Sequence, residues 1–379
     1  MLERNSFLMR KSIWDRFAAV PDPRVDRTKR HKLQDILVIA VCGVICGAEH
    51  WTDVEMFGKV NEAWFRTFLD LPNGIPSHDT FGRVFAVLDP DAFEAVVQAF
   101  VADLAGSSRG KHIAIDGKTL RGSFDQASAK GPLHMVSAWV HENHVAFGQR
   151  AVDAKSNEII AIPELLKLLD VEEATVTIDA IGCQKEIAEQ IIDQGGDYVL
   201  ALKANQQSLY TDVQMYMDDG IAHGFTGEQD FWETVEKGHG RLETRHVWTT
   251  SDVGWLQGRH DWPALGSLTA VERKRQVNGH CERKRHYFIS SHPGHCAQRL
   301  GTLIRNHWSV EVQLHWSLDV CFHEDSCRVR MANAAENFSR LRRIALMLLK
   351  QEKTGNSGIA GKRLRAGWDR DYLLKVLGI

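Results

Sequence analysis

Two aspartates occupy matching places in the sequence and could hold a divalent metal ion together. Asp116 ends the apolar run HIAID, and Asp179 ends the run TVTID. Runs of this length and composition are typical of buried strands. Because sites in α/β sheets gather at the carboxyl ends of strands, we expect the two carboxylates to lie side by side. Carboxylate oxygens suit Mg²⁺ or Mn²⁺, and a bound cation relieves the repulsion between the two like charges.

A pair of metal ions held in this way could drive phosphoryl transfer, by activating a water or hydroxyl and stabilising the leaving oxygen. An aspartate before glycine or alanine is also a common turn former, so a structural role is the alternative for each. The site needs a third acid. A helix is predicted around residues 304–319, and the residues alone leave four candidates on or just after it: Glu311, Asp319, Glu324 and Asp325.

Apolar periodicity predicts a helical region over residues 1–106, ahead of the two aspartates. We expect helices at 33–48, 54–69 and 91–104, with a shorter one for which Pro76-Ser77 is the predicted N-terminal cap. Short helices joined in this way could form a helix-turn-helix that reads DNA, or a plain helical bundle.

Residues 107–353 are predicted to form an α/β domain with a mixed central sheet and helices on its faces. Its expected strands are 111–117, 133–140, 144–152, 174–180 and 197–203, with helices at 157–169 and 185–194. An insertion at about 205–292 is expected to extend the sheet with strands at 231–237, 241–250, 267–277 and 283–291. Helices are then expected at 300–316 and 332–353, and residues 354–379 are interpreted as a basic tail with a short helix.

The bulk composition gives no global sign of a nucleic-acid partner, because the net charge of the 379 residues is −3. A DNA-binding function must therefore depend on local basic clusters. The odd number of scattered cysteines, seven, favours a reducing cytoplasm over a disulfide framework. The apolar stretch 36–48 is shorter than the about 20 residues that span a membrane, so no membrane partner is expected.

Two groups of cations are candidates for phosphate contact. Lys118 and Arg121 directly follow Asp116, although a charged turn is the alternative. The motif EKGHGRLETR surrounds a Gly-His-Gly turn, where glycines allow close approach of a phosphate to the backbone. A solvated hairpin is the alternative there. The candidate DNA-binding residues of this motif are Lys237, His239, Arg241 and Arg245.

Further basic runs suggest that the positive charge is segregated on the surface, as a DNA substrate requires. These runs are 24–32, 273–275, 283–285, 340–343 and 362–365.

Taken together, these motifs resemble those of DDE transposases of bacterial insertion sequences, and more closely the ISAs-one family with its H-repeat-associated proteins. The resemblance extends over nearly the whole chain. The motifs that carry it are DPRVDRTKRHKLQDIL, GIPSHDTFGRVF, IAIDGKTLRGS, TIDAIGCQKEIA, DYVLALKANQ, EKGHGRLETR, IRNHWSVE, LHWSLDVCFHEDSCRVR and KRLRAGWDRDYLL.

The resemblance implies an RNase H-like catalytic domain with a β-rich insertion, preceded by an all-helical domain. Its three catalytic and metal-binding acids fall on Asp116, Asp179 and Glu311, which selects Glu311 among the four candidates. It also implies two Mg²⁺ or Mn²⁺ ions, cleavage of double-stranded DNA at the element ends, strand transfer into target DNA, and a homodimer on DNA in the bacterial cytoplasm. Arg305 and His307, just before Glu311, are expected to contact DNA.

Two alternatives to the transposase activity remain at this point: an inactive relative that binds DNA without cutting it, and a nuclease of the same fold without strand transfer.

The sequence also departs from the related patterns near the third acid. Val312 stands where family members usually have asparagine. The wider insertion-sequence group has a tyrosine, an arginine and a lysine at the positions of Ile304, His307 and Leu318.

Overall fold

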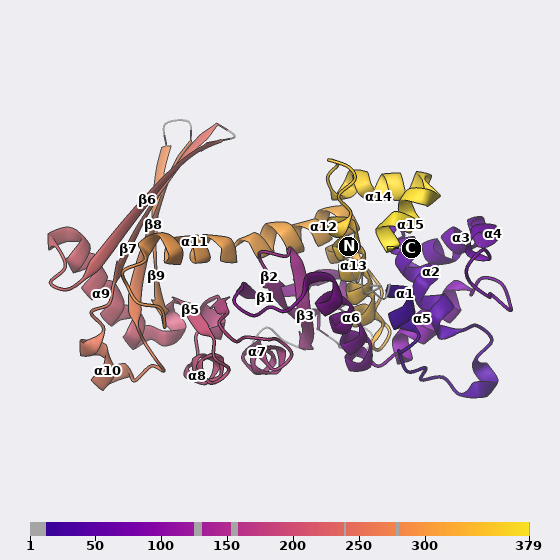
Figure 1. Ribbon diagram of the computed structural model, residues 1–379, viewed down its shortest axis with the longest axis horizontal. Coiled ribbons are helices and arrows are strands. Elements are labelled where there is room, and N and C mark those ends of the chain that lie inside the picture. Colours follow the sequence, from indigo (N-terminus) through magenta and orange to yellow (C-terminus); the bar gives the residue numbers. More distant parts are fainter. Residues whose placement is uncertain (1–12, 125–130, 153–157, 239, 278–279, 379) are drawn as a thin grey trace, which may run out of the picture.

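One mixed sheet is the central element of the computed structural model, which describes residues 13–124, 131–152, 158–238, 240–277 and 280–378. In these residues nine strands follow the order β3-β2-β1-β4-β5-β9-β8-β7-β6. Figure 1 shows strands β6 to β9 at one end of the molecule and the helices of both chain termini at the other. Among the described residues, no helix combines the length and the apolar character needed to cross a membrane.

The first five strands form the RNase H-like half of the sheet that was expected. Strand β1 pairs antiparallel with β2, and β2 with β3, whereas β1, β4 and β5 run parallel. Helices α7 and α8 precede β4 and β5, which agrees with the predicted alternation of strands and helices. The bounds are β1 His112–Leu120, β2 Leu133–Val140, β3 Val145–Val152, β4 Thr175–Ile178, β5 Asp197–Leu202, α7 Glu158–Leu166 and α8 Lys185–Asp193.

The insertion adds four antiparallel strands to the same sheet, because β9 pairs with β5. They are β6 Gln229–Gly238, β7 Arg241–Thr250, β8 Ser267–Val277 and β9 His280–Ser290. The prediction of strands here is confirmed, but two helices of the insertion were missed: α9 Gln207–His223 and α10 Gly254–His260. The buried face of α9 is a narrow stripe that includes Leu209, Val213 and Met217. Because so few apolar residues repeat at the helical spacing, the sequence carries only a weak sign of this helix.

Helices from both ends of the chain form the other end of the molecule (Figure 1). In α5 the Ser77 side chain accepts a hydrogen bond from the Thr80 backbone, the cap that the sequence predicted. Almost all of α2 is buried, and α13 packs against it. The first six helices are α1 Ile13–Phe17, α2 Leu33–Ile45, α3 Trp51–Val60, α4 Glu62–Phe65, α5 His78–Val87 and α6 Pro90–Ala105.

The last part of the chain begins with a nearly continuous helical run and ends in two short helices. The helices are α11 Ala297–His307, the π-helical segment η6 Glu311–Trp316, α12 Ser317–Phe322, α13 Ala334–Gln351, α14 Ile359–Trp368 and α15 Arg370–Leu377. The expected basic tail is thus two helices packed on the protein. Lys362 and Arg363 are buried, and their side chains donate hydrogen bonds to the carbonyls of Leu349 and Val44, each at 2.9 Å.

The basic run 340–343 also serves the fold. Arg340 and Arg343 on α13 are fully buried, and both form ion pairs with the buried carboxylate of Glu94 on α6. A buried carboxylate with two guanidinium partners fixes the register of the two helices, since losing one partner leaves an unpaired buried charge. The basic run 340–343 and the first two residues of the run 362–365 therefore lie inside the protein, whereas Arg365 is exposed.

Candidate active site

The register of the sheet sets the two aspartates beside each other. Strands β1 and β4 pair Ile115 with Ile178, so the next residues along them are Asp116 on β1 and Asp179, which directly follows β4. The sequence predicted that both strands end at their aspartate. Strand β4 ends at Ile178, but β1 continues to Leu120, because β2 goes on supplying partners to β1 after the pairing with β4 has ended.

Asp179 also shapes the turn that follows β4. It is the N-cap of the short helix η4 (Ala180–Gly182), and its Oδ1 accepts a hydrogen bond from the Ile181 backbone at 3.1 Å. The turn-forming role that the sequence left open is thus present. It uses one carboxylate oxygen, so the other remains available for a ligand.

Asp116 lies in a cluster of negative charge. Burial, followed by the neighbouring charges of Asp179 and Glu311, raises the pKa of this carboxyl to about 7. The imidazole Nδ1 of His315 lies 3.4 Å from Asp116 Oδ2. Burial lowers the pKa of His315 to about 4, so this imidazole is neutral near pH 7 and does not balance the carboxylates.

Glu311 is the first residue of the π-helical segment η6. Such segments are rare and are often found at functional sites. Its side chain is exposed and lines the same cavity as Asp179. Among the described residues, no three His, Cys, Asp or Glu side chains are close enough to hold one metal ion at present. Glu311 therefore lies near the two aspartates, but it is not in a ligand position with them.

The structure separates Glu311 from the other three candidates for the third acid. The ammonium of Lys118 binds both Asp319 and Glu324, and the Arg121 guanidinium lies 3.6 Å from Asp325. Of these four acids, Glu311 is the one for which the described residues supply no cation. A carboxylate without a cation partner is the one best able to accept a metal ion.

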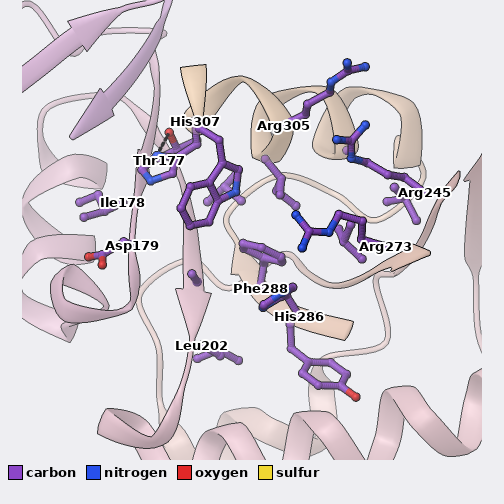
Figure 2. Close-up of a pocket in the computed structure, with 18 of the residues that line it drawn as sticks. Thr177, Ile178, Asp179, Leu202, Arg245, Arg273, His286, Phe288, Arg305 and His307 are labelled. Carbon is purple, nitrogen blue, oxygen red and sulfur yellow. Dashed lines mark hydrogen bonds between the residues drawn. The ribbon is translucent and has the colours of Figure 1, made fainter. Parts of the chain in front are cut away.

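A cavity of about 520 Å³ opens beside the acids, between the sheet and α11. Figure 2 shows Asp179 on one side of it and Arg245, Arg273 and Arg305 on the other. The cross-strand register pairs Arg245 with Arg273, and Arg273 with Lys284. Arg245, Arg273 and Lys284, here called the basic row, therefore lie side by side across β7, β8 and β9 on the face toward α11.

The predicted DNA-binding residues of the insertion lie in different surroundings. Lys237 and Arg241 are exposed near the β6–β7 turn, whereas His239 lies outside the described residues. Arg245 is half-buried and pairs with Glu243 and Glu236. Arg305 on α11 is exposed and also pairs with Glu236, which joins β6 to α11.

Two predicted DNA contacts have partners within the protein instead. His307 is buried, and its Nδ1 lies 2.9 Å from the Thr177 hydroxyl of β4, as Figure 2 shows. The Lys118 side chain is 11% exposed and is enclosed by its two carboxylate partners. Arg121, three residues further on, has a side chain that is 82% exposed. Of these three residues, Arg121 alone presents its charge to the solvent.

Arg273 and Lys284 were not singled out from the sequence, although both belong to predicted basic runs. The signal that could have found them is strand alternation, because successive side chains point to opposite faces. Sorting the runs 273–275 and 283–285 by this period separates the residues that face the cavity from those on the other face. The cavity lies on the face of the sheet against which α11 packs.

Comparison with known proteins identifies the class. A family model described as "Transposase DDE domain" matches residues 107–348, and one described as "DDE_Tnp_1-associated" matches residues 14–101. The first match covers more than half of the chain, so the chain belongs to the DDE transposase family. This confirms the resemblance inferred from its motifs.

Two proteins of Escherichia coli are similar over nearly their whole length. "Putative transposase YncI" of strain O157:H7 is 40% identical over 372 residues, which cover 97% of this chain and 94% of that one. "H repeat-associated putative transposase YhhI" of strain K12 is 38% identical over 372 residues, which cover 97% and 98%. A solved piggyBac transposase synaptic complex with hairpin DNA gives a TM-score of 0.45 at 11% identity, covering 96% of this chain and 79% of that one, too low a likeness to carry an argument.

Proposed function

We propose that this protein cuts DNA at the ends of an insertion sequence and joins those ends to target DNA. Asp116, Asp179 and Glu311 act at the reacting phosphate. The observation that carries the proposal is the β1–β4 register, which sets the two aspartates side by side in a cluster without a balancing cation. Membership of the DDE transposase family supports the same reaction.

Two Mg²⁺ or Mn²⁺ ions are the proposed cofactors. The residues fit such ions, because carboxylate oxygens are hard ligands and the raised pKa of Asp116 marks a like-charge cluster that a cation would stabilise. Asp116 and Asp179 would hold the ions, and Glu311 would complete the shell of one. When bound, such ions activate the attacking water or hydroxyl and stabilise the leaving oxygen.

The basic row and the exposed cations near it are proposed to position the DNA backbone. Phosphate contacts of this kind fix the register of a duplex without reading its sequence. Arg245 and Arg305 line the cavity that Asp179 and Glu311 also line, so a strand held by these arginines would reach the acids. Lys237, Arg241 and Arg121 are proposed as outer contacts because their side chains are exposed.

The proposed substrate is double-stranded DNA, both the element ends and the target. Two ends must be held at once for one element to move, so we propose a homodimer on DNA. The helices of the N-terminal region remain candidates for sequence reading. These helices pack around α2 and α13, and this packing would hold a DNA-reading helix in a fixed position.

The test is a set of reactions on a supercoiled plasmid that carries the two inverted repeats flanking the reading frame. We expect nicking and end cleavage with Mg²⁺ or Mn²⁺, loss of both with a chelator, and joining of pre-cut ends to target DNA. Binding without cleavage would identify an inactive DNA-binding relative. Cleavage without joining would identify a nuclease of the same fold.

A further inference from the structure

Strand β1 and the helical run that carries Glu311 are held together by matched side chains. On β1, Asp116 and Lys118 are two residues apart and point to the same face of the sheet. On the run 311–322, here called the Glu311 helix, Glu311, His315 and Asp319 follow at intervals of four and share one face. His315 meets Asp116 at 3.4 Å, and Asp319 meets Lys118.

Lys118 is at the centre of this contact. Its ammonium binds Asp319 and, at 2.9 Å, Oε2 of Glu324 in η7 (Glu324–Ser326). Glu324 is fully buried, and its other oxygen accepts a hydrogen bond from the Ser339 hydroxyl of α13 at 2.9 Å. One cation thus joins the strand of Asp116 to the Glu311 helix and, through Glu324, to α13.

The segment after Lys118 packs against the same region. A Cβ on Gly122 would lie 2.3 Å from the Cys327 carbonyl and 2.8 Å from the Asp325 carbonyl, so the two backbones are in direct contact. Beside this contact, the Arg121 guanidinium approaches the Asp325 carboxylate at 3.6 Å. The Arg121 side chain remains exposed, unlike that of Lys118. The Lys118 ammonium, enclosed by its two carboxylate partners, has little freedom to reach a phosphate outside.

We propose that Lys118 is a positioning residue: held between Asp319 and Glu324, it fixes the Glu311 helix against the strand that carries Asp116. It does not contact DNA. This inference depends on the proposed function, because it assigns to Lys118 the positioning of the helix that carries Glu311, the proposed third acid, beside the strand of Asp116. Removing the ammonium would separate like-charged Asp319 and Glu324 and shift the Glu311 helix away from β1.

The experiment measures Mn²⁺ binding to the full-length, metal-free protein by electron paramagnetic resonance of free Mn²⁺. DNA affinity is measured in parallel as a function of salt. We expect Lys118→Met to weaken Mn²⁺ binding by about 10- to 100-fold, the scale on which supporting residues act on metal affinity. The salt dependence of DNA binding should not change. Lys118→Arg keeps the charge and should recover most of the Mn²⁺ affinity.

Arg121→Met is the matched control, since it removes an exposed cation from the same segment. It should leave Mn²⁺ affinity unchanged and lower the slope of DNA affinity against salt by about one phosphate contact.

If Lys118→Met does not fold, Asp319→Asn replaces it, because Asp319 is half-exposed and its substitution leaves the Lys118–Glu324 pair in place. It should weaken Mn²⁺ binding less than Lys118→Met would.

Several outcomes would overturn the inference. Wild-type Mn²⁺ affinity in Lys118→Met, or in Asp319→Asn if that variant is used, contradicts a positioning role. A reduced salt slope in Lys118→Met, like that of Arg121→Met, would make Lys118 a DNA contact. Failure of the wild-type protein to bind Mn²⁺, or unchanged binding in Asp116→Asn, overturns the proposed function and this inference with it. Normal metal binding by the wild type with an unaffected Lys118→Met overturns the inference alone.

Discussion

The two halves of the sheet carry charges of opposite sign, and they differ in how deeply those charges are buried. In the half formed by β1 to β5, Asp116 and Asp179 are adjacent and largely enclosed, and burial raises the pKa of Asp116. In the half formed by β6 to β9, the basic row lies on an open face beside the cavity. Its Lys284 pairs with Glu282 at 2.7 Å, and both of these side chains are about half exposed.

This difference separates two tasks within one continuous sheet (Figure 1). An enclosed acidic pair binds a small cation strongly, because little solvent screens its charges. Exposed cations bind a large polyanion through many weak contacts that salt reduces. The comparison therefore predicts that variants in one half change metal chemistry and variants in the other change DNA affinity.

The largest effect is expected from Asp116→Asn in the acidic half. The variant keeps the shape of the side chain but removes the charge of a proposed metal ligand. Cleavage of an end-bearing plasmid with Mg²⁺ should fall by on the order of 10²–10³-fold or more, a loss typical of active-site electrostatic groups. DNA affinity should stay within about twofold, since the proposed phosphate contacts are made by other residues. Asp193→Asn, an exposed aspartate at the end of α8, is the control, and cleavage retained in Asp116→Asn contradicts the assignment.

The next effect is expected from the double variant Arg273→Ala with Lys284→Ala in the basic half. The slope of DNA affinity against salt should decrease by about two, one for each lost phosphate contact. Mn²⁺ affinity should remain that of the wild type. The control is Lys274→Ala with Arg283→Ala, a cross-strand pair on the opposite face of the same two strands. Equal loss of salt dependence in both double variants would break the assignment of the DNA to the cavity face.

A smaller effect, on stability, is expected from Gly117→Ala beside the acidic pair. A Cβ there would lie 2.5 Å from both Glu158 Oε1 and His134 Nε2. These two buried side chains contact each other at 2.5 Å and cannot move apart without losing that contact. The free energy of unfolding in urea should decrease by about 1–3 kcal/mol, the usual cost of overpacking. Gly238→Ala on β6, where a Cβ meets nothing within 4 Å, should change it little.

The smallest effect is expected from Gly301→Ala, where α11 crosses the basic half. A Cβ there would lie 2.8 Å from the Trp232 ring and from Val247 Cγ2. Alanine also favours a helix over glycine by about 1 kcal/mol, which offsets part of the clash. The Trp232 ring is half-buried and can shift. The loss of unfolding free energy should therefore be smaller than in Gly117→Ala, and a larger loss would show that the basic half is the more rigidly packed of the two.

The sequence by itself determined the local features of this protein. The apolar runs ending in Asp116 and Asp179 predicted two strands whose acids meet, because apolar length and a terminal acid are visible within a few residues. The Ser77 cap and the four strands of the insertion were predictable for the same reason. Glu311 needed the family pattern in addition, since four acids in that region had equal claims from composition.

The tertiary structure alone decided which charges face each other. Lys118 and Asp319 are 201 positions apart in the chain, and Thr177 and His307 are 130 positions apart. No local pattern reveals such pairs. Burial then determines what each group does. An enclosed cation such as Lys118 must find a carboxylate within the fold, because an unpaired buried charge is costly. An exposed one such as Arg121 keeps most of its side chain in solvent even with Asp325 at 3.6 Å, where a phosphate could meet it.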